Sequence, residues 1–420
     1  MKISLHSPAR KAAVLAAAMV IALLYFAETA REFAASWLGG RVQLKSLQYA
    51  ARFDPLDADY RDHLGRYYAL IARDPSTAVG YYRSAVALNP HFAGYWFDLA
   101  STYQILGDVA NQTAALEGAI EADPMTPDVA WQAANLHLVQ GQNAKALHEF
   151  SVVMANDPSL ADVSIRFCWR IDPNVDSLLR DVVPHTAEAY LAFLQLLEAQ
   201  PEDLGTSKVW DALIDTHQHF SLQDLKEYIQ FLIKHKEVDQ AVTAWQKAVA
   251  NLGLTSYLPS AKNLIVNPRF GLDILNAGFD WQYTKQTSVT LTLDPSDFHA
   301  GRRSLLVAFD GPGISDAGIY QLIAVQPNTT YDFSAYYKNG ELMEGAGGPH
   351  LTIQDMYTQA VYYDSDELKD AGGFWKSVDG EFTTPADCKL VVLHLSRIPA
   401  GSPIRGKLWV DDFRLTPKPS

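Results

Sequence analysis

Two short stretches of the chain hold residue types that bind metals or take part in acid–base chemistry. Asp411 and Asp412 are adjacent in GKLWVDDFRL, from Gly406 to Leu415, whose β-branched and aromatic residues predict a strand. Successive side chains on a strand point to opposite faces, so at most one of these carboxylates faces a common site. His217 and His219 lie two residues apart in DTHQHF, and residues two apart on a helix do not share a face. Neither spacing predicts a metal centre.

Motifs of catalysis and cofactor binding are missing from the sequence. It contains no H-E-x-x-H or C-x-x-C, and no G-x-S-x-G, P-loop or G-x-G-x-x-G. Hydrolysis of a glycoside would need two carboxylates held at a set separation across a cleft, and no segment resembles a catalytic domain. The sequence therefore favours a protein that is not an enzyme and has no cofactor.

Length, charge and cysteine content limit the remaining classes. The 420 residues carry a formal net charge of −14, and no basic stripe follows the N-terminus, so a nucleic-acid binder is not expected. This length predicts two or three domains. Cys168 and Cys388 fall in different predicted domains, which indicates two packed thiols and no disulfide framework.

The N-terminus has the layout of a membrane-targeting segment. Arg10 and Lys11 precede an uncharged, largely apolar run of 16 residues from Ala12 to Ala27. As a helix this run would span about 24 Å, slightly less than the roughly 30 Å hydrocarbon core, and flanking residues can lengthen it. A cleaved signal peptide has the same layout, with Ala34 and Ser36 as a weak cleavage site, and a buried helix is the third alternative. Because ETAREFAASWL continues the helical pattern, we favour an uncleaved signal-anchor with the first residues in the cytoplasm.

Four prolines divide the next part of the chain at a near-constant interval. Each follows Asn or Asp after a helix-like apolar segment, and they are 35, 34 and 34 residues apart: Pro55, Pro90, Pro124 and Pro158. Such a step ends one helix and starts the next. Small residues recur where two helices would approach, large residues fill the gap, and Gly turns the corner. These repeat-packing positions include Trp96, Leu99, Tyr103, Gly107, Pro124, Gly141, Phe150 and Pro158.

This pattern resembles the tetratricopeptide repeat family over about residues 50–158, in three consecutive units. After Pro158 the phase degrades, and we interpret residues 159–253 as diverged repeats that continue the same solenoid. In this family the concave surface commonly binds protein segments, so the resemblance implies a protein partner. The tyrosines and tryptophans of the repeats are expected to serve packing.

The hydrophobic period changes to two from Asn263 onward. The runs that predict strands are SVTLTLD, SLLVAFDG, IYQLIAV, TYDFSAYYK, HLTIQDM, FWKSVDGEFTT, KLVVLHLS and KLWVDDFRL, with turns between them at places such as Asn339–Gly340. Many short strands separated by regular turns predict an all-β sandwich or jelly roll.

The order of NLIVNPRF, HAGRRSLLV, YQLIAVQPNTTYDFSAYYK and GKLWVDDFRL resembles the β-jelly-roll family of carbohydrate-binding modules that accompany xylanases and glucanases, related to galactose-binding-like domains. The resemblance spans residues 263–415. It implies that the closing-strand Asp411 helps to hold a structural calcium ion near the AGRRS turn. Gly271 stands where the family often has an acidic residue, which removes one ligand. The alternative for Asp411 is a hydrogen bond to a buried turn.

Sugar binding in this family uses aromatic rings that stack on C–H bonds, with amides and carboxylates that fix hydroxyl groups. The resemblance implies as candidates Trp281, Tyr283, Tyr336, Tyr357, Tyr362, Tyr363 and Trp375, with Gln354 and Asp355 as polar partners. Trp281 and Trp375 stand at motif positions that are usually core, so packing is favoured for them. For the tyrosines of DMYTQAVYYDSDE, a variable and presumed exposed stretch, sugar contact and packing are equally open.

The sequence thus predicts a multidomain α + β chain: an N-terminal transmembrane helix, an all-α tetratricopeptide-type solenoid and a C-terminal all-β jelly roll. The predicted parts are residues 1–35, the repeats at 36–253, a linker at 254–262, the jelly roll at 263–416 and a tail at 417–420. Its architecture predicts a single-pass inner-membrane scaffold, mostly periplasmic, that holds a protein partner and touches a glycan in surface polysaccharide assembly or export. The alternative is a pure protein-interaction adaptor whose jelly roll binds no sugar.

Overall fold

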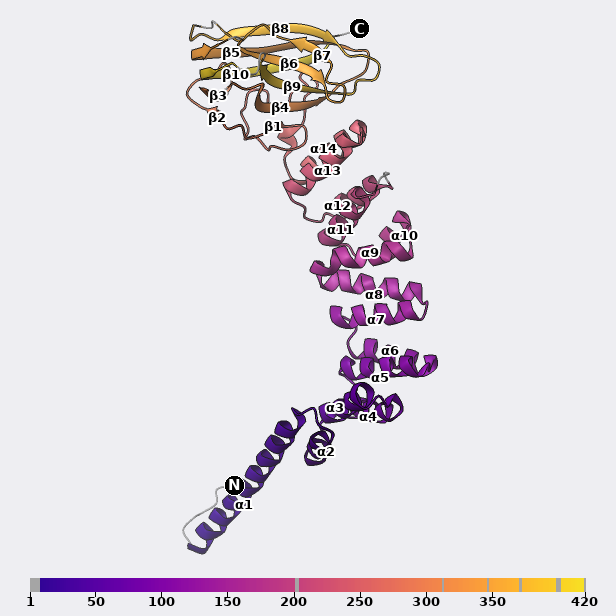
Figure 1. The fold of residues 1–420 in the computed structure, drawn as a ribbon. Helices are drawn as coiled ribbons and strands as arrows, with labels where there is room; N and C mark the ends of the chain where they lie inside the picture. The colour runs from indigo at the N-terminus through magenta and orange to yellow at the C-terminus, as the bar shows by residue number, and fades with distance from the viewer. Residues whose placement is uncertain are drawn as a thin grey trace. The chain divides into compact units, whose positions relative to one another are not determined.

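The computed structural model describes residues 8–200, 204–311, 313–345, 347–369, 372–397 and 402–418. The chain divides into two compact units, Met1–Leu196 and Leu197–Ser420 (Figure 1). The first seven residues of the predicted cytoplasmic tip and the last two of the predicted tail lie outside the described residues.

All the regular elements of the first unit, within its described residues, are helices. Its elements are α1 (Pro8–Gly39), α2 (Leu44–Phe53), α3 (Ala58–Arg66), the π-helical turn η1 (Tyr67–Ile71), α4 (Pro75–Leu88), α5 (Ala93–Leu106), α6 (Val109–Ala122), α7 (Pro127–Val139), α8 (Asn143–Asn156), η2 (Pro158–Leu160), α9 (Ala161–Ile171), α10 (Val175–Asp181) and α11 (Ala187–Glu198). The boundary between the units falls within α11.

Helix α1 is long enough and apolar enough to cross a membrane, and its most apolar 18-residue stretch is entirely exposed. An exposed apolar helix of this length would be costly in water, because it leaves large apolar surface unburied. A signal sequence near the N-terminus has the same length and composition. The length and the apolar composition of α1 therefore agree with the predicted membrane anchor.

Consecutive helices pack in pairs, α3 with α4, α5 with α6, and α7 with α8. The predicted prolines end helices, but the next helix starts later than expected: α5 begins three residues after Pro90, and α7 three residues after Pro124. Both prolines lie in the connections between pairs, because a ring without an N–H cannot continue the preceding helix.

A small residue on one helix of a pair lies where a large ring of the other helix crosses it. A Cβ added to Gly118 on α6 would lie 2.7 Å from the ring of Trp96 on α5. Gly107 and Gly141 take φ +71° in the turns after α5 and α7, a left-handed conformation that favours glycine. Other repeat-packing positions are buried: Leu99, Tyr103 and Phe150. The helical part therefore has the arrangement of a repeat solenoid, in which each pair buries its apolar face against its neighbours.

The second unit combines three helices with the β-sandwich. Its elements are α12 (Thr206–Asp215), α13 (Leu222–Lys234), α14 (Val238–Asn251), η3 (Thr255–Tyr257), β1 (Trp281–Tyr283), β2 (Val289–Asp294), β3 (Ser304–Gly311), β4 (Asp316–Ala324), β5 (Thr330–Glu344), β6 (Pro349–Asp355), β7 (Val361–Asp364), β8 (Lys376–Thr383), β9 (Leu390–Arg397) and β10 (Ile404–Pro417).

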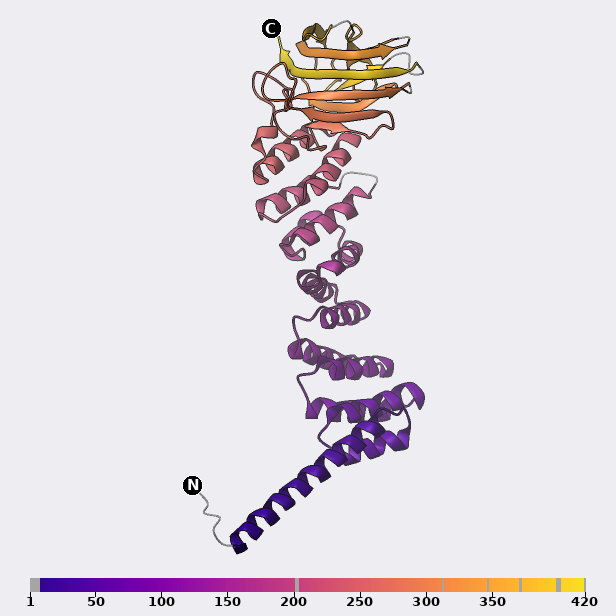
Figure 2. The same cartoon turned by 90° about the vertical axis from the view of Figure 1, so that its left-hand side faces the viewer.

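The strands form two five-stranded sheets with the orders β1-β4-β9-β6-β7 and β2-β3-β10-β5-β8 (Figure 2). Every strand pair described is antiparallel. Alternate residues of the strands point inward and form one core between the sheets, centred on rings such as Phe270, Trp281, Phe333 and Phe413. The predicted fold class is confirmed: a helical part is followed by an all-β sandwich.

The structure differs from the predicted strands in two places. The turn predicted at Asn339–Gly340 is wrong, because β5 continues through it to Glu344. Gly340 leaves room for the ring of Trp409, which would lie 3.1 Å from an added Cβ, and Glu341 takes φ +51° beside an irregularity in the pairing with β10. Asn339 and Gly340 themselves pair with Leu408 and Lys407, and the bulge follows them on β5, before Met343. The stretch presumed exposed around Tyr362 is partly the edge strand β7.

The last helical pair packs directly on the sandwich. Trp245 of α14 is 1 % exposed, and its indole N–H donates to the carbonyl of Tyr257 at 3.2 Å. A Cβ on Gly278 would lie 2.2 Å from the Trp245 ring, and Phe279 meets the same ring edge-on. The sequence divides the chain at residues 254–262, whereas the compact unit that holds the sandwich begins at Leu197.

Both cysteines are free and buried. Cys168 lies in the first unit and Cys388 in the second. Burial disfavours the thiolate and raises the pKa of Cys168 to about 12 and that of Cys388 to about 11.

Trp245→Ala is expected to lower the free energy of unfolding of the second unit by about 3–5 kcal/mol, because it leaves a cavity between α14 and Gly278. Urea unfolding of residues 197–420 measures the change. Tyr283→Ala, which removes a ring that is 46 % exposed, is the control and should cost much less. Equal losses in the two variants would contradict a packed junction.

Candidate functional site

A polar hollow of about 380 Å³ lies on the outer face of the sheet β1-β4-β9-β6-β7. Its floor consists of outward-pointing residues of the three central strands, among which Tyr320 pairs in register with His394, and Val392 with both Leu322 and Gln354. Asp316, Thr284 and Gln286 close one side, and Met356 and Gln359 the other. The hollow therefore collects residues from segments that are far apart in the sequence.

The polar groups of the floor are held in place by hydrogen bonds. The imidazole Nδ1 of His394 lies 2.5 Å from a carboxylate oxygen of Asp316. Tyr320 donates its hydroxyl to Gln282 at 3.3 Å, and the Gln282 amide donates to the carbonyl of Gly278 at 2.6 Å. Gln282 is 3 % exposed and pairs in register with Tyr320 across β1 and β4, so it holds the tyrosine hydroxyl from the neighbouring strand.

Gly318 allows the segment with Thr284 and Gln286, which forms one side of the hollow, to lie close to the floor. It takes φ +81°, and an added Cβ would lie 2.3 Å from the carbonyl oxygen of Thr284. The amide of Thr284 donates to the Gly318 carbonyl at 2.7 Å. Any larger residue at this position would push the segment with Gln286 away from the floor.

The residues predicted for sugar contact do not come together in one place. Of the set, Gln354 lines the hollow. Asp355 is 5 % exposed and accepts hydrogen bonds from the amides of Tyr357 and Thr358 at 2.8 and 2.7 Å. The hydroxyl of Tyr362 donates to the other oxygen of Asp355 at 3.2 Å. The structure thus gives Asp355 a role in closing a turn.

The remaining aromatic candidates contact other parts of the chain. Tyr357 donates its hydroxyl to the carbonyl of Ile233 on α13 at 2.9 Å. Tyr363 packs on Phe333, with 5.2 Å between ring centroids, and Trp281 lies in the core. On the other sheet, Tyr336 stacks on His299 at 3.6 Å between ring centroids, and Trp375 lies beside the same imidazole.

The two carboxylates near the C-terminus have different surroundings. Asp411 is fully buried, and its oxygens accept the amides of His299, Ala300 and Asp412 at 2.8, 2.9 and 2.7 Å. Burial raises the pKa of Asp411, and these amides oppose the rise. Asp412 takes φ +49° in a bulge of β10 and pairs with Arg269 at 2.7 Å.

Three N–H groups directed at one carboxylate do not fit a calcium ligand set, because amide dipoles and a cation compete for the same oxygen lone pairs. Within the described residues, no group of three or more His, Cys, Asp or Glu side chains is placed to hold a metal. Asp411 instead fastens the turn before AGRRS, and calcium binding stays a prediction.

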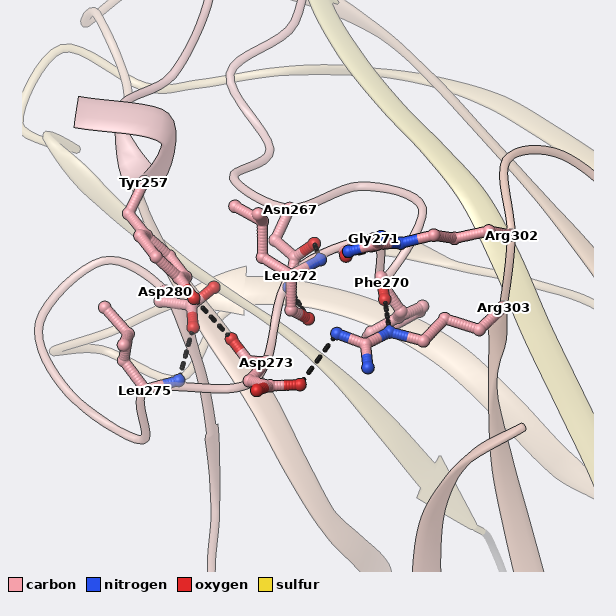
Figure 3. A network of polar contacts seen from close by, with 10 residues as sticks. All are labelled: Tyr257, Asn267, Phe270, Gly271, Leu272, Asp273, Leu275, Asp280, Arg302 and Arg303. Atoms are coloured by element: carbon pink, nitrogen blue, oxygen red, sulfur yellow. Dashed lines mark hydrogen bonds and ion pairs between the residues drawn. The ribbon is translucent and has the colours of Figure 1, made fainter. Parts of the chain in front are cut away.

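A network of polar contacts fixes the loop that leads from the helices into β1 (Figure 3). Arg303 donates to the carbonyl of Phe270 and pairs with Asp273 at 2.8 Å, and Tyr257 donates to the Asp273 carbonyl at 2.9 Å. Asp280, which is fully buried, accepts the amide of Leu275 at 2.8 Å through Oδ2. Its Oδ1 is buried without a partner in the part of the chain that the structure describes.

The hollow has the chemistry of a binding site for hydroxyl-rich molecules. Amides and a carboxylate offer both donors and acceptors, while Tyr320, Leu322 and Met356 offer surface for C–H groups. Asp316 is the one carboxylate among the described lining residues. The paired carboxylates of a glycosidase are therefore not among these residues.

Sequence reasoning missed Tyr320, His394 and Asp316. The signal was present in part, because the alternation in IYQLIAV and KLVVLHLS places Tyr320 and His394 on the face opposite the apolar residues. The order of the strands was needed as well, since β4, β9 and β6 are neighbours in the sheet and not in the sequence.

Comparison with known proteins bears on this geometry. Residues 262–399 match the family model described as a carbohydrate binding domain. The C-terminal sandwich carries a carbohydrate-binding module domain. No curated protein matches the chain.

Solved structures resemble separate parts of the chain. A structure described as "CBM4 structure and function" has 16 % identity and a TM-score of 0.25, and covers 33 % of this chain and 88 % of its own. The CBM22-1 xylan-binding domain from Paenibacillus barcinonensis Xyn10C has 16 % identity and a TM-score of 0.24, with 33 % and 86 % covered. MamA protein has 15 % identity and a TM-score of 0.26, with 45 % and 91 % covered. At these TM-scores the likenesses support no inference about ligands or partners.

The stability of the second unit is expected to fall as pH rises from about 4 to about 7. Burial raises the pKa of Asp280 from 3.8 to about 7, so the folded state holds a proton that the unfolded chain has already released. Ionisation in this window costs up to about 1.4 kcal/mol per pH unit. Urea unfolding of residues 197–420 at pH 5 and pH 8 measures the slope, which Asp280→Asn should reduce. A variant with the slope of the native sequence would assign the pH dependence to other groups.

Proposed function

We propose that this chain is a non-catalytic, membrane-anchored scaffold whose carbohydrate-binding module domain holds a glycan in the hollow on the sheet β1-β4-β9-β6-β7. The observation that supports it best is the hollow itself: donors and acceptors surround Tyr320 over a volume of about 380 Å³. That volume accommodates a few sugar units of a chain lying across the sheet. The family match over residues 262–399 supports the same ligand class.

Individual residues have distinct roles in this proposal. Tyr320 and Leu322 contact the C–H face of a sugar ring, and Gln354 donates to and accepts from hydroxyl groups through its amide. Asp316 and His394 hold each other in place through the 2.5 Å contact, so that the carboxylate, as an acceptor, and the imidazole ring have fixed positions in the hollow. Fixed groups lose little conformational freedom on binding, which favours affinity.

The helical repeats, of tetratricopeptide type by their period of 34, hold a protein partner in this proposal. In this proposal the exposed apolar helix α1 anchors the chain in an inner membrane. The basic residues that precede the apolar run stay in the cytoplasm, which places the bulk of the chain in the periplasm. A membrane anchor, a protein-binding array and a glycan-binding domain together suit the assembly or export of a surface polysaccharide.

Gln354→Ala is expected to weaken glycan binding about tenfold, the loss of roughly one good hydrogen bond to the ligand. His394→Ala is expected to weaken it as well, because it removes the imidazole that holds the Asp316 carboxylate at 2.5 Å. Binding is measured on a glycan array, and then by titration, with the full chain in a detergent without a sugar head group. Asp379→Asn is the control, because Asp379 lines a polar hollow on the outer face of the other sheet.

Glycan binding that survives both hollow variants would move the site elsewhere on the sandwich. A folded chain that binds no glycan on the array would favour the adaptor, in which the sandwich has a structural role.

The anchor has its own test. The full chain is expected to stay with membranes during alkaline carbonate extraction, whereas a chain without residues 1–40 is released, because a single apolar helix of this length is retained by the bilayer. Detection of the N-terminal residues by mass spectrometry in the extracted protein distinguishes an uncleaved anchor from a cleaved signal. Release of the full chain would contradict anchoring.

A further inference from the structure

One wall of the hollow is a short turn between β6 and β7. Met356 and Gln359 of this turn line the hollow. The turn is closed from inside by Asp355, whose amide donates to the carbonyl of Ala360 at 2.9 Å and whose carbonyl accepts the amide of Gln359 at 3.0 Å. The Met356 amide donates to the carbonyl of Leu390 at 3.1 Å.

The Asp355 carboxylate also accepts the amides of Tyr357 and Thr358, and outside these bonds the turn has few contacts with the sandwich. Met356, Thr358, Gln359 and Ala360 are exposed. A surface turn of this kind has few contacts that would keep its side chains in one arrangement. Tyr357 is the exception, since its ring is half-buried and points away from the hollow toward α13.

Tyr357 ties the turn to the end of α13. Its hydroxyl donates to the carbonyl of Ile233 at 2.9 Å, and the ammonium of Lys236 lies 5.4 Å from the centre of its ring. Ile233 belongs to the last turn of α13, where carbonyl groups carry the negative end of the helix dipole and attract a donor. The contact joins residues 124 positions apart in the sequence.

The α13–α14 pair packs against the sandwich. The hydrogen bond from Tyr357 therefore ends on a helix that is itself held on the sandwich. Trp245 of α14 fills the space over Gly278, and Asp239 pairs with Lys389 at 2.5 Å next to β9. Helix α13 packs on α14. Its C-terminal carbonyl therefore has a defined position relative to the strands that form the floor of the hollow.

We infer that the α13–α14 pair is a working part of the glycan site, and that Tyr357 is a positioning residue which holds the Met356–Gln359 wall against the ligand. This inference rests on the proposed function of the hollow. It assigns Tyr357 no contact with the sugar. It also makes the last helical pair, and not the sandwich alone, the smallest unit with full affinity.

The test uses Tyr357→Phe in the full chain, which removes the hydroxyl and keeps the ring. The glycan that binds best on the array is expected to bind 3- to 10-fold more weakly, with the thermal unfolding midpoint unchanged. Amide hydrogen exchange of residues 356–360 is expected to become faster, because the turn loses its outer attachment. Lys236→Ala should change both readouts in the same direction and by less.

Tyr363→Phe is the matched control. It removes a hydroxyl that also donates to a backbone carbonyl, that of Asp379 at 3.4 Å, but on the side of β8. The control is expected to keep the affinity and the exchange rates of the native sequence.

The outcomes separate the inference from the proposed function. If the native chain binds a glycan and Tyr357→Phe binds it equally well with unchanged exchange, the positioning role is overturned. If the native chain binds no glycan, the proposed function fails, and exchange of the turn alone then decides whether Tyr357 anchors it. Weaker binding in both Tyr→Phe variants would also overturn the inference, since the effect would not be specific to α13.

Discussion

Each helical pair of a repeat array has an apolar face that only a neighbour can cover, and this constraint governs the rest of the structure. A pair at the end of an array lacks a neighbour and would expose that face to water. Here the final pair, α13–α14, lies against the sandwich through Trp245, Phe279 and Gly278. The β domain therefore serves the helical part as a cap in addition to any ligand it binds. The absence of a Cβ at Gly278 is what permits the indole ring to lie so close to the loop.

The contact between α14 and the loop at Gly278 also affects two polar regions of the sandwich, which are the network around Arg303 and the hollow beside Tyr320. The loop fastened by Arg303 and Asp280 (Figure 3) also contains Gly278, against which the Trp245 ring packs, and it leads into β1. Strand β1 carries Gln282, which accepts a hydrogen bond from Tyr320 on the neighbouring strand. Packing of helix on loop, ion pairing within the loop and hydrogen bonding beside Tyr320 thus form a continuous series of contacts. Fold stability and the geometry of the candidate site are not independent properties of this chain.

The elements with strong periodicity could be predicted from the sequence, and the contacts between them could not. Gly107, Gly141 and the prolines recur because each helix must stop and the chain must turn before the next one, so the period of 34 is visible without a structure. Eight strands were visible by alternation, while β1 and β7 were missed, since three or four residues show too little alternation. The hollow was missed because His394 and Tyr320 meet only after β4 and β9 pair. For Tyr357 the sequence left sugar contact and packing equally open, because its partner, the carbonyl of Ile233, is a backbone atom that no side-chain pattern reveals.

The buried thiols have a practical consequence. Cys168 and Cys388 are the two cysteines of the chain, both fully enclosed and both protonated at neutral pH, since their pKa values lie near 12 and 11. Maleimide dyes react with thiolates, so a cysteine introduced on the surface would be labelled far faster than either native residue. One dye in the helical unit and another in the sandwich would report, by energy transfer, the distance between the two units in solution without removal of any native side chain.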